Sequence, residues 1–369
     1  MQTSLISSFL SLKIVSLTLG LLGIGLVMAV HEFGHFIFGK LFNVHIPNFS
    51  IGMGPKIASK KIGETTFSLS LIPVGAYVEA DNDPKTAGGK HRTISHKTYL
   101  QKMAIVSGGI LGNLLLAYLI FIGLSLTGVP ANPLLMQKSP YSIEKILPDS
   151  LAEKNGLQKG DRILTFNNVD VSNEVTLLLK LLKTTDQEAL LTVERDNKIE
   201  TITLTHSQDK QKKGITLGVE FKFPSLAPVN FGQACIQSST LVMQLLKNTA
   251  QGFMQAFTQK SASNFAGPLM MISLTAQSAR NGFASLFLFL AFISVGLAFL
   301  NAIPLAVLDG GHALIYTLEA LLGHTLPESF ERAFQYLSLG LLGILFLYLT
   351  YKDILMLFIK PIFAFLKLK

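Results

Sequence analysis

The sequence predicts a polytopic α-helical membrane protein with about four transmembrane helices, a membrane-associated β-hairpin or sheet and one inserted α+β domain. Three observations predict this class. Only 15% of the 369 residues are charged, against about a quarter in soluble domains. The charges are gathered in blocks, and the apolar stretches between them are long enough for spanning helices. One later segment, in contrast, has the composition of a soluble domain.

Four apolar stretches reach the roughly 20 residues that a spanning helix needs. Residues 230–258 are also apolar, but recurrent Gln and Ser favour an amphipathic helix at the membrane interface. The first stretch can also be interpreted as the core of a signal peptide, although it is long for one and ends in polar residues. The predicted spans are 13–38, 103–127, 284–305 (in a segment that ends at 311) and 334–357.

Charge predicts the orientation and excludes some functions. Residues 40–102 contain nine basic and four acidic side chains, so the positive-inside rule predicts that this loop is cytoplasmic. Both termini and the inserted domain then lie on the opposite side. The basic residues are too dispersed for a nucleic-acid site. Cys235 is the single cysteine, which excludes an internal disulfide framework and a Cys-rich zinc module.

The first predicted span ends in the sequence Val30-His31-Glu32-Phe33-Gly34-His35. Ionisable residues inside a span are costly and indicate a functional site. His31 and His35 are four residues apart, so on a helix they project from one face, where two imidazoles can bind one metal ion. Glu32 is placed to accept a proton from a metal-activated water. A chance match or two structural histidines are the alternatives, but neither explains a glutamate that nothing in a membrane solvates.

Catalytic zinc usually has three protein ligands, and the acid at the right depth to be the third is Asp309. Pro304 and the pair Gly310-Gly311 indicate that the helix breaks around it. For Asp309 alone, a helix C-cap at the headgroups is an equal interpretation; together with the histidines, a zinc site of two His and one Asp is favoured. Asn301 can donate a hydrogen bond to the substrate or its oxyanion, or instead to a neighbouring helix.

The motifs HEFGH in an early span and NAIPLAVLDGG in a late one are similar to those of the site-2 protease family of intramembrane zinc metalloproteases, peptidase family M50. The closest likeness is to its bacterial branch, the regulator of sigma-E protease type, over nearly the whole chain. The resemblance implies that His31, His35 and Asp309 bind Zn²⁺ and that Glu32 is the catalytic base.

The same resemblance implies a substrate and a location. The expected substrate is a single-span membrane protein already cut outside the membrane by another protease, such as an anti-sigma factor or a signal-peptide remnant. The expected location is the bacterial inner membrane, with the active site toward the cytoplasm. Three positions depart from the family pattern: Ile110 and Ala306 replace prolines, and Gly296 stands where many relatives have asparagine. None is a ligand, so they concern substrate handling more than zinc chemistry.

Residues 46–80 resemble the membrane-associated β-loop of that branch. Apolar and polar residues alternate in Thr66–Leu71, which predicts a strand with one apolar face, and Gly54-Pro55 and Gly63-Glu64 are turn signals. A free edge near the metal can add the substrate as an extra strand; the alternative is a hairpin that only packs on the bilayer. The predicted substrate-binding residues are Asn301, Pro304, Phe67, Leu69 and Leu71.

Residues 129–226 are rich in charges of both signs, and Ile146–Leu164 resembles the core of a PDZ domain. We expect a strand at 162–166 and a hairpin over 190–205 around Asp196-Asn197. PDZ domains bind chain ends by strand addition, so this domain either binds a peptide ligand or excludes bulky substrates. The predicted organisation is a first membrane half (1–128), a PDZ domain (129–226) and a second membrane half (227–369).

Two other classes of function compete with a protease. A non-catalytic membrane PDZ scaffold predicts degraded ligand motifs, whereas both motifs are intact. A metal transporter accounts for His and Asp in the membrane, but not for the HExxH glutamate or the inserted domain. The expected partners are therefore a single-span substrate, the lipid bilayer and a peptide ligand of the PDZ domain.

Overall fold

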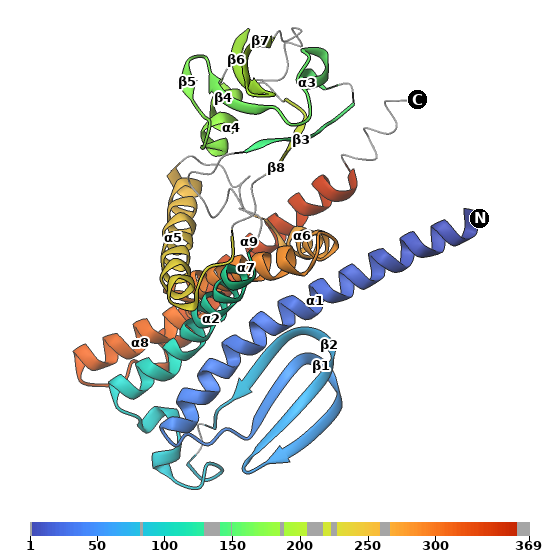
Figure 1. Ribbon diagram of the computed structural model, residues 1–369. Helices are drawn as coiled ribbons and strands as arrows, with labels where there is room; N and C mark the ends of the chain where they lie inside the picture. The colour runs from blue at the N-terminus through green and yellow to red at the C-terminus, as the bar shows by residue number, and fades with distance from the viewer. Residues whose placement is uncertain are drawn as a thin grey trace. The chain divides into compact units, whose positions relative to one another are not determined.

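The chain forms two compact units, which are described separately (Figure 1). The membrane unit combines Met1–Leu124 with Cys235–Lys369, and the inserted unit is Ser125–Ala234. The computed structural model describes residues 2–81, 84–128, 141–148, 150–184, 188–204, 217–222, 227–258 and 266–359.

Among the described residues, four helices are long and apolar enough to cross a membrane, as predicted. The predicted third span differs from its helix, which ends at Asn301 rather than at 305. Pro304 explains this end, because it lacks an amide donor and disfavours a helical conformation in the residue before it. The four helices are α1 (Gln2–Leu41), α2 (Tyr99–Thr127), α7 (Phe283–Asn301) and α9 (Glu328–Ile354).

The described part of the second half of the chain contains three further α-helices. The stretch predicted as an amphipathic helix is α5 (Phe231–Thr258), whose place at the membrane interface stays a prediction. Helices α6 (Pro268–Arg280) and α8 (Asp309–Leu322) were not predicted. Because α8 begins at Asp309, the helix C-cap interpretation of this aspartate is wrong. A carboxylate in the first turn of a helix interacts favourably with the helix dipole.

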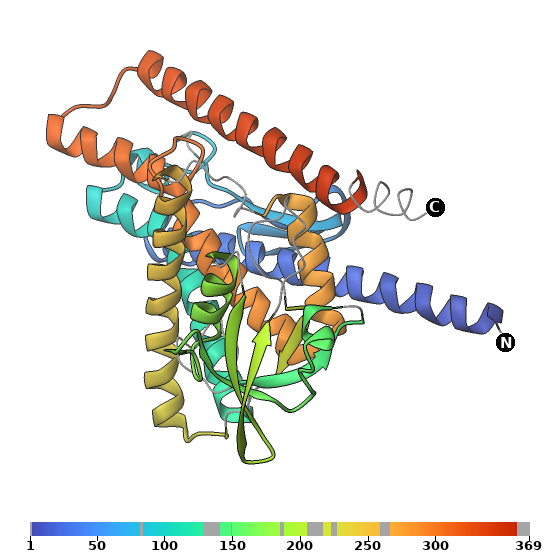
Figure 2. The same ribbon diagram turned by 90° about the horizontal axis from the view of Figure 1, so that it is seen from above.

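The C-terminal half of α1 packs among the other helices. Val27 forms a buried apolar cluster with Leu286 and Leu290 of α7, and Leu116 and Ile120 of α2 pack against it. Helix α6 contacts α1, α7 and α9 (Figure 2). This packing fixes the segment of α1 that carries the histidine motif.

A small antiparallel sheet lies beside α1, as predicted for residues 46–80 (Figure 1). Its strands β1 (Asn48–Ile62) and β2 (Thr65–Glu79) are long and bent, so that Phe49 is opposite both Phe67 and Val78. The apolar face predicted for Thr66–Leu71 is present, but it points outward. Leu69 and Leu71 are exposed, whereas Ser68 and Ser70, which alternate with them along the strand, are buried. Such a face suits contact with lipid rather than with a protein core.

The inserted unit contains a four-stranded sheet in the order β5-β4-β6-β7 and a separate pair, β3-β8. The strand predicted at 162–166 is β4, and the hairpin predicted around Asp196-Asn197 is β6-β7. Both turn residues have positive φ, 48° and 60°, which Asn and Asp tolerate better than most residues. The elements are β3 (Ser142–Ile146), α3 (Leu151–Lys154), β4 (Arg162–Phe166), β5 (Val169–Asp170), α4 (Val175–Thr184), β6 (Ala189–Arg195), β7 (Lys198–Leu204) and β8 (Val219–Lys222).

The inserted unit has its own apolar core, which includes Ile163, Leu178 and Leu191. Asp161, 1% exposed, forms an ion pair with Arg195 at 2.7 Å. This contact links the turn before β4 to the end of β6, and Asp161 raises the pKa of the Arg195 guanidinium. Asp149 of the PDZ-like sequence lies outside the described residues, and the identification as a PDZ domain stays a prediction.

Candidate metal centre

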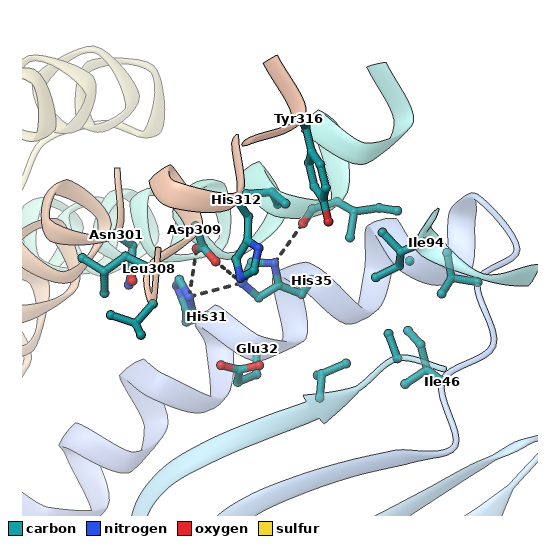
Figure 3. Close-up of a pocket in the computed structure, with 17 residues that line it drawn as sticks. His31, Glu32, His35, Ile46, Ile94, Asn301, Leu308, Asp309, His312 and Tyr316 are labelled. Atoms are coloured by element: carbon teal, nitrogen blue, oxygen red, sulfur yellow. Dashed lines mark hydrogen bonds and ion pairs between the residues drawn. The ribbon is translucent and has the colours of Figure 1, made fainter. Parts of the chain in front are cut away.

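Helix α1 presents His31 and His35 on one face, as their spacing predicts (Figure 3). The two rings meet edge to face with their centroids 4.8 Å apart, and their Nε2 atoms are 3.2 Å apart. His31 is buried, with 7% of its surface exposed. The two imidazole nitrogens therefore face the same small volume.

Asp309, at the start of α8, points into this volume (Figure 3). Its Oδ2 lies 3.2 Å from His31 Nε2, and its Oδ1 lies 3.3 Å from His35 Nε2. One ligand atom from each of the three residues lies within 4.8 Å of the others. Residues separated by more than 270 positions in the sequence thus form one group.

The close approach of α1 and α2 makes this geometry possible. Gly34 lies against Gly108, and a Cβ on either residue would overlap the backbone of the other. A Cβ on Gly109 would lie 2.6 Å from His31 Cε1 and 2.7 Å from His31 Nε2, and it would overlap His35 Nε2. Glycine is therefore required at the contact, because any other side chain displaces the imidazoles or the helices.

The irregular segment between α7 and α8 brings Asp309 to the histidines. It contains Pro304, and its turn is closed by hydrogen bonds from Leu308 N to Leu305 O (2.8 Å) and from Gly311 N to Leu308 O (3.0 Å). Ala306 N also donates to Ser338 Oγ of α9 at 3.0 Å. Irregular backbone at membrane depth is tolerated where its polar groups are satisfied in this way.

The facing atoms of the three residues are suited to a cation. His35 Nδ1 lies 2.9 Å from the Ile105 carbonyl, which can only accept, so Nδ1 carries the hydrogen and Nε2 of the neutral ring has a lone pair. Asp309 Oδ2 is buried without a hydrogen-bond partner among the described residues. Two imidazole nitrogens and one carboxylate oxygen are the donor set of a catalytic zinc site with one open position. The residues present therefore fit zinc.

Glu32 lies on the side of the site that faces β2 (Figure 3). Val78 of β2 lines the same cavity as Glu32. The predicted base thus lies between α1 and the last part of β2, next to the first histidine. This position leaves it free to receive a proton from a water molecule in the site.

Glu32 and the three ligand-type residues line one cavity of about 410 Å³. Asn301 and His312 add polar groups at this end. Beyond His35 the lining becomes apolar, with small or branched side chains: Gly39, Val44, Ile46, Val78, Ala80, Ile94, Ile105 and Val106. The cavity can therefore hold a polar reacting group and an apolar side chain at the same time.

The residues predicted to bind substrate lie in different places. Asn301 lines the cavity and is 9% exposed. Pro304 lies in the irregular segment that precedes Asp309 and is not among the cavity-lining residues. Phe67 packs against Phe36 and Phe49, while Leu69 and Leu71 lie on the exposed face of the sheet. Their contact with substrate stays a prediction.

Sequence reasoning missed two groups at the site. The Ile105 carbonyl is a backbone group, so no side-chain pattern indicates it. Asn113 is different, because an asparagine inside an apolar span is itself a signal. Its Nδ2 lies 3.2 Å from His31 Nδ1.

Comparison with known proteins identifies the family. The model of peptidase family M50 matches residues 19–345. The chain belongs to peptidase family M50. Relatives include proteins named as zinc metalloproteases in Clostridium acetobutylicum (28% identical, over 92% of this chain and 97% of the relative) and Synechocystis sp. (30%, over 90% and 92%). The chain is also similar to the chloroplastic membrane metalloprotease ARASP of Arabidopsis thaliana (29%, over 90% and 78%).

The family match confirms three predictions made from the sequence. The resemblance to family M50 is correct, and the protein is a zinc metalloprotease whose cofactor is Zn²⁺. Its apolar helices and its membrane metalloprotease relatives make it a membrane protein. The residues that bind zinc, the place of cleavage and the orientation stay predictions.

Proposed function

We propose that this metalloprotease hydrolyses peptide bonds of single-span membrane proteins within or near the bilayer. In this proposal His31, His35 and Asp309 bind zinc and Glu32 is the catalytic base. One observation carries it: the three ligand atoms converge within 4.8 Å, and both histidines lie on a helix long enough to cross a membrane. A peptide bond must therefore reach membrane depth to be cut.

The side chains of the site have separate tasks in this reaction. Zinc, when bound, lowers the pKa of a coordinated water to about 7 and polarises the scissile carbonyl. The Glu32 carboxylate accepts a proton from the attacking water and passes it to the leaving amine. Asn301 donates its amide hydrogen to the substrate backbone or to the oxyanion.

The β1-β2 sheet is proposed to hold the substrate extended. A helical substrate has its peptide groups engaged in internal hydrogen bonds, so the segment to be cut must unwind. Val78, in the last part of β2, lines the cavity together with Glu32, and this position supports strand addition there. Exposed Leu69 and Leu71, together with Phe67, support contact with lipid or an apolar substrate. Pro304 is proposed to contact the same segment.

The inserted unit and the charge pattern supply the remaining parts of the proposal. The inserted unit is proposed to be a PDZ domain that acts as a size filter or binds a peptide, so that only substrates already cut outside the membrane enter. The basic loop over 40–102 supports a cytoplasmic active site and an extracytoplasmic PDZ domain. The proposed location is a bacterial inner membrane.

The test uses the purified full-length protein in lipid vesicles with a single-span model substrate. We expect cleavage that is lost with a chelator and restored by zinc. Glu32→Gln should retain zinc and lose cleavage by at least about 100-fold, because the amide cannot accept the proton. Glu328→Gln, on the exposed start of α9, is the matched control and should cleave normally.

Elemental analysis of Asp309→Ala tests the third ligand, with a fall in zinc content expected. Undiminished cleavage by Glu32→Gln would overturn the proposed base, and an unchanged zinc content of Asp309→Ala would overturn the ligand set. Zinc-dependent binding without hydrolysis would favour a PDZ scaffold. Zinc movement across the vesicle membrane would favour a transporter.

A further inference from the structure

Asn113 of α2 lies beside the site without lining its cavity. Its side chain is completely buried, with 0% of the residue exposed. Its Nδ2 lies 3.2 Å from His31 Nδ1, which is the ring nitrogen that points away from Asp309. Asn113 therefore contacts a proposed zinc ligand from behind.

The second histidine indicates what a group in this position does. His35 Nδ1 donates to the Ile105 carbonyl at 2.9 Å, which directs the lone pair of Nε2 toward His31 and Asp309. For His31 to offer its own Nε2 lone pair, its Nδ1 must also carry a hydrogen. That hydrogen needs an acceptor, and the polar side chain in contact with Nδ1 is Asn113.

The amide of Asn113 can supply that acceptor. Its Oδ1 is buried and has no hydrogen-bond partner among the described residues, which is costly for a carbonyl oxygen. A half-turn of the amide about its last side-chain bond exchanges Oδ1 with Nδ2 and brings the oxygen to His31 Nδ1. This one rotation gives the orphaned oxygen a donor and His31 an acceptor.

The backbone that carries Asn113 is held firmly at this place. Gly109, one helical turn earlier, lies directly against both histidine rings. A Cβ on Gly112 would lie 2.9 Å from the Val30 carbonyl, so α2 touches α1 here as well. Ser294 Oγ of α7 donates a hydrogen bond to the backbone carbonyl of Asn113 at 2.8 Å. The backbone of Asn113 is therefore held in place beside His31.

We propose that Asn113 is a positioning residue, whose Oδ1 accepts a hydrogen bond from His31 Nδ1 and fixes the tautomer and ring orientation in which Nε2 binds zinc. This inference rests on the proposed role of His31 as a ligand. Removing a hydrogen-bond partner of this kind from behind a ligating histidine typically lowers metal affinity about 10- to 100-fold. Asn113 does not touch the substrate or the reacting atoms.

The test measures zinc affinity of the full-length protein in detergent by competition with a chromogenic chelator. Asn113→Leu keeps the approximate size but removes the acceptor, and should weaken zinc binding about 10- to 100-fold. Asn113→Asp keeps an oxygen beside Nδ1 and should bind zinc within about two-fold of the unchanged protein, since carboxylates commonly serve this role. Thermal unfolding of the zinc-free proteins should show a cooperative transition for both variants, so that a loss of zinc affinity is not a loss of folding.

Two controls separate this role from packing and from the proposed function. Ser294→Ala removes a buried hydrogen bond to the same helix but leaves the amide of Asn113, so its zinc affinity should change by less than about three-fold. Equal losses in Asn113→Leu and Asn113→Asp, or none in Asn113→Leu, would overturn the inference. His31→Ala tests whether His31 is a zinc ligand at all. If His31→Ala binds zinc normally, the proposed ligand set is wrong. If His31→Ala loses zinc but Asn113→Leu does not, only the role of Asn113 is overturned.

Discussion

Helices α1 and α9 are both long enough to cross the membrane, yet their glycines lie in opposite surroundings. In α1, a Cβ on Gly25 would overlap the Pro73 carbonyl of β2, and a Cβ on Gly34 would overlap the backbone of α2. In α9, a Cβ on Gly340 or Gly343 would meet nothing within 4 Å. In the most apolar 18-residue stretch of α1, 33% of the stretch is buried, whereas in that of α9 only 6% is buried.

The difference shows where precise geometry is needed. Helix α1 carries both histidines, and its glycines allow α2 and the sheet to approach closely enough to complete the site. Helix α9 is attached at a few polar points. The Ser338 hydroxyl accepts a hydrogen bond from a backbone amide in the loop before Asp309. The Asp353 carboxylate accepts hydrogen bonds from backbone amides at the start of α6. The rest of its surface is apolar, as expected for contact with lipid tails.

The largest effect is expected from glycine substitutions at the contact of α1 and α2. Gly34→Ala places a Cβ against the Gly108 backbone, which cannot move as a side chain can. The two helices should separate, and a misplacement of about 1 Å lowers catalytic rates by about 100-fold. We expect loss of cleavage together with a loss of zinc content, measured by elemental analysis.

The matched substitution in α9 is Gly343→Ala, which places the same methyl group in open space. We expect normal cleavage and zinc content. Equal damage from both substitutions would show that α9 packs as tightly as α1 in the functioning protein, and the contrast between the two helices would be wrong.

A smaller and more local effect is expected at Gly109, one residue beyond the contact between Gly34 and Gly108. A Cβ in Gly109→Ala meets imidazole atoms of His31 and His35, which can rotate away without moving the backbone. We expect a folded protein with zinc affinity weaker by about 10-fold or more. Gly123→Ala, on the same helix with nothing within 4 Å, is the control and should bind zinc normally. Chelator competition measures both, and equal affinities would contradict the close contact at Gly109.

Much of the site could be predicted because its signals are local. The spacing of His31 and His35 defines one face of a helix, and the charge-free stretches define the spans. Asp309 was selected by its depth and by the surrounding Pro and Gly residues. The pairing of these three residues across the fold needed only the assumption that polar groups inside a membrane gather together.

The missed features depend on contacts between distant segments. Helix α8 begins at Asp309, directly after a loop in which the Ala306 amide donates a hydrogen bond to Ser338 Oγ of α9. No local sequence pattern predicts that bond. Alternation in Thr66–Leu71 predicts a strand but not which face is covered. In a soluble protein Leu69 and Leu71 would be inside, whereas here the serines are buried and Ser70 Oγ lies 3.1 Å from Ser50 Oγ.

The smallest effect is expected at the attachment of α9 to α6. Asp353, 1% exposed, accepts hydrogen bonds from Gly267 N (3.2 Å) and Met270 N (2.9 Å), and thus caps α6 from a neighbouring helix. Asp353→Ala leaves these amides without their acceptor and should lower the free energy of unfolding by about 1 kcal/mol, as for other lost N-caps. The melting temperature should fall while zinc affinity and cleavage below that temperature stay unchanged.

Asp353→Asn is the matched control, because an asparagine oxygen caps a helix about as well as a carboxylate. Its melting temperature should lie close to that of the unchanged protein. The two substitutions together measure how α9 contributes: through one capping contact to stability, and not through the geometry of the metal centre. If Asp353→Ala instead loses zinc as Gly109→Ala is expected to, then α9 positions the ligands too, because its second contact, at Ser338, leads directly to the loop that carries Asp309.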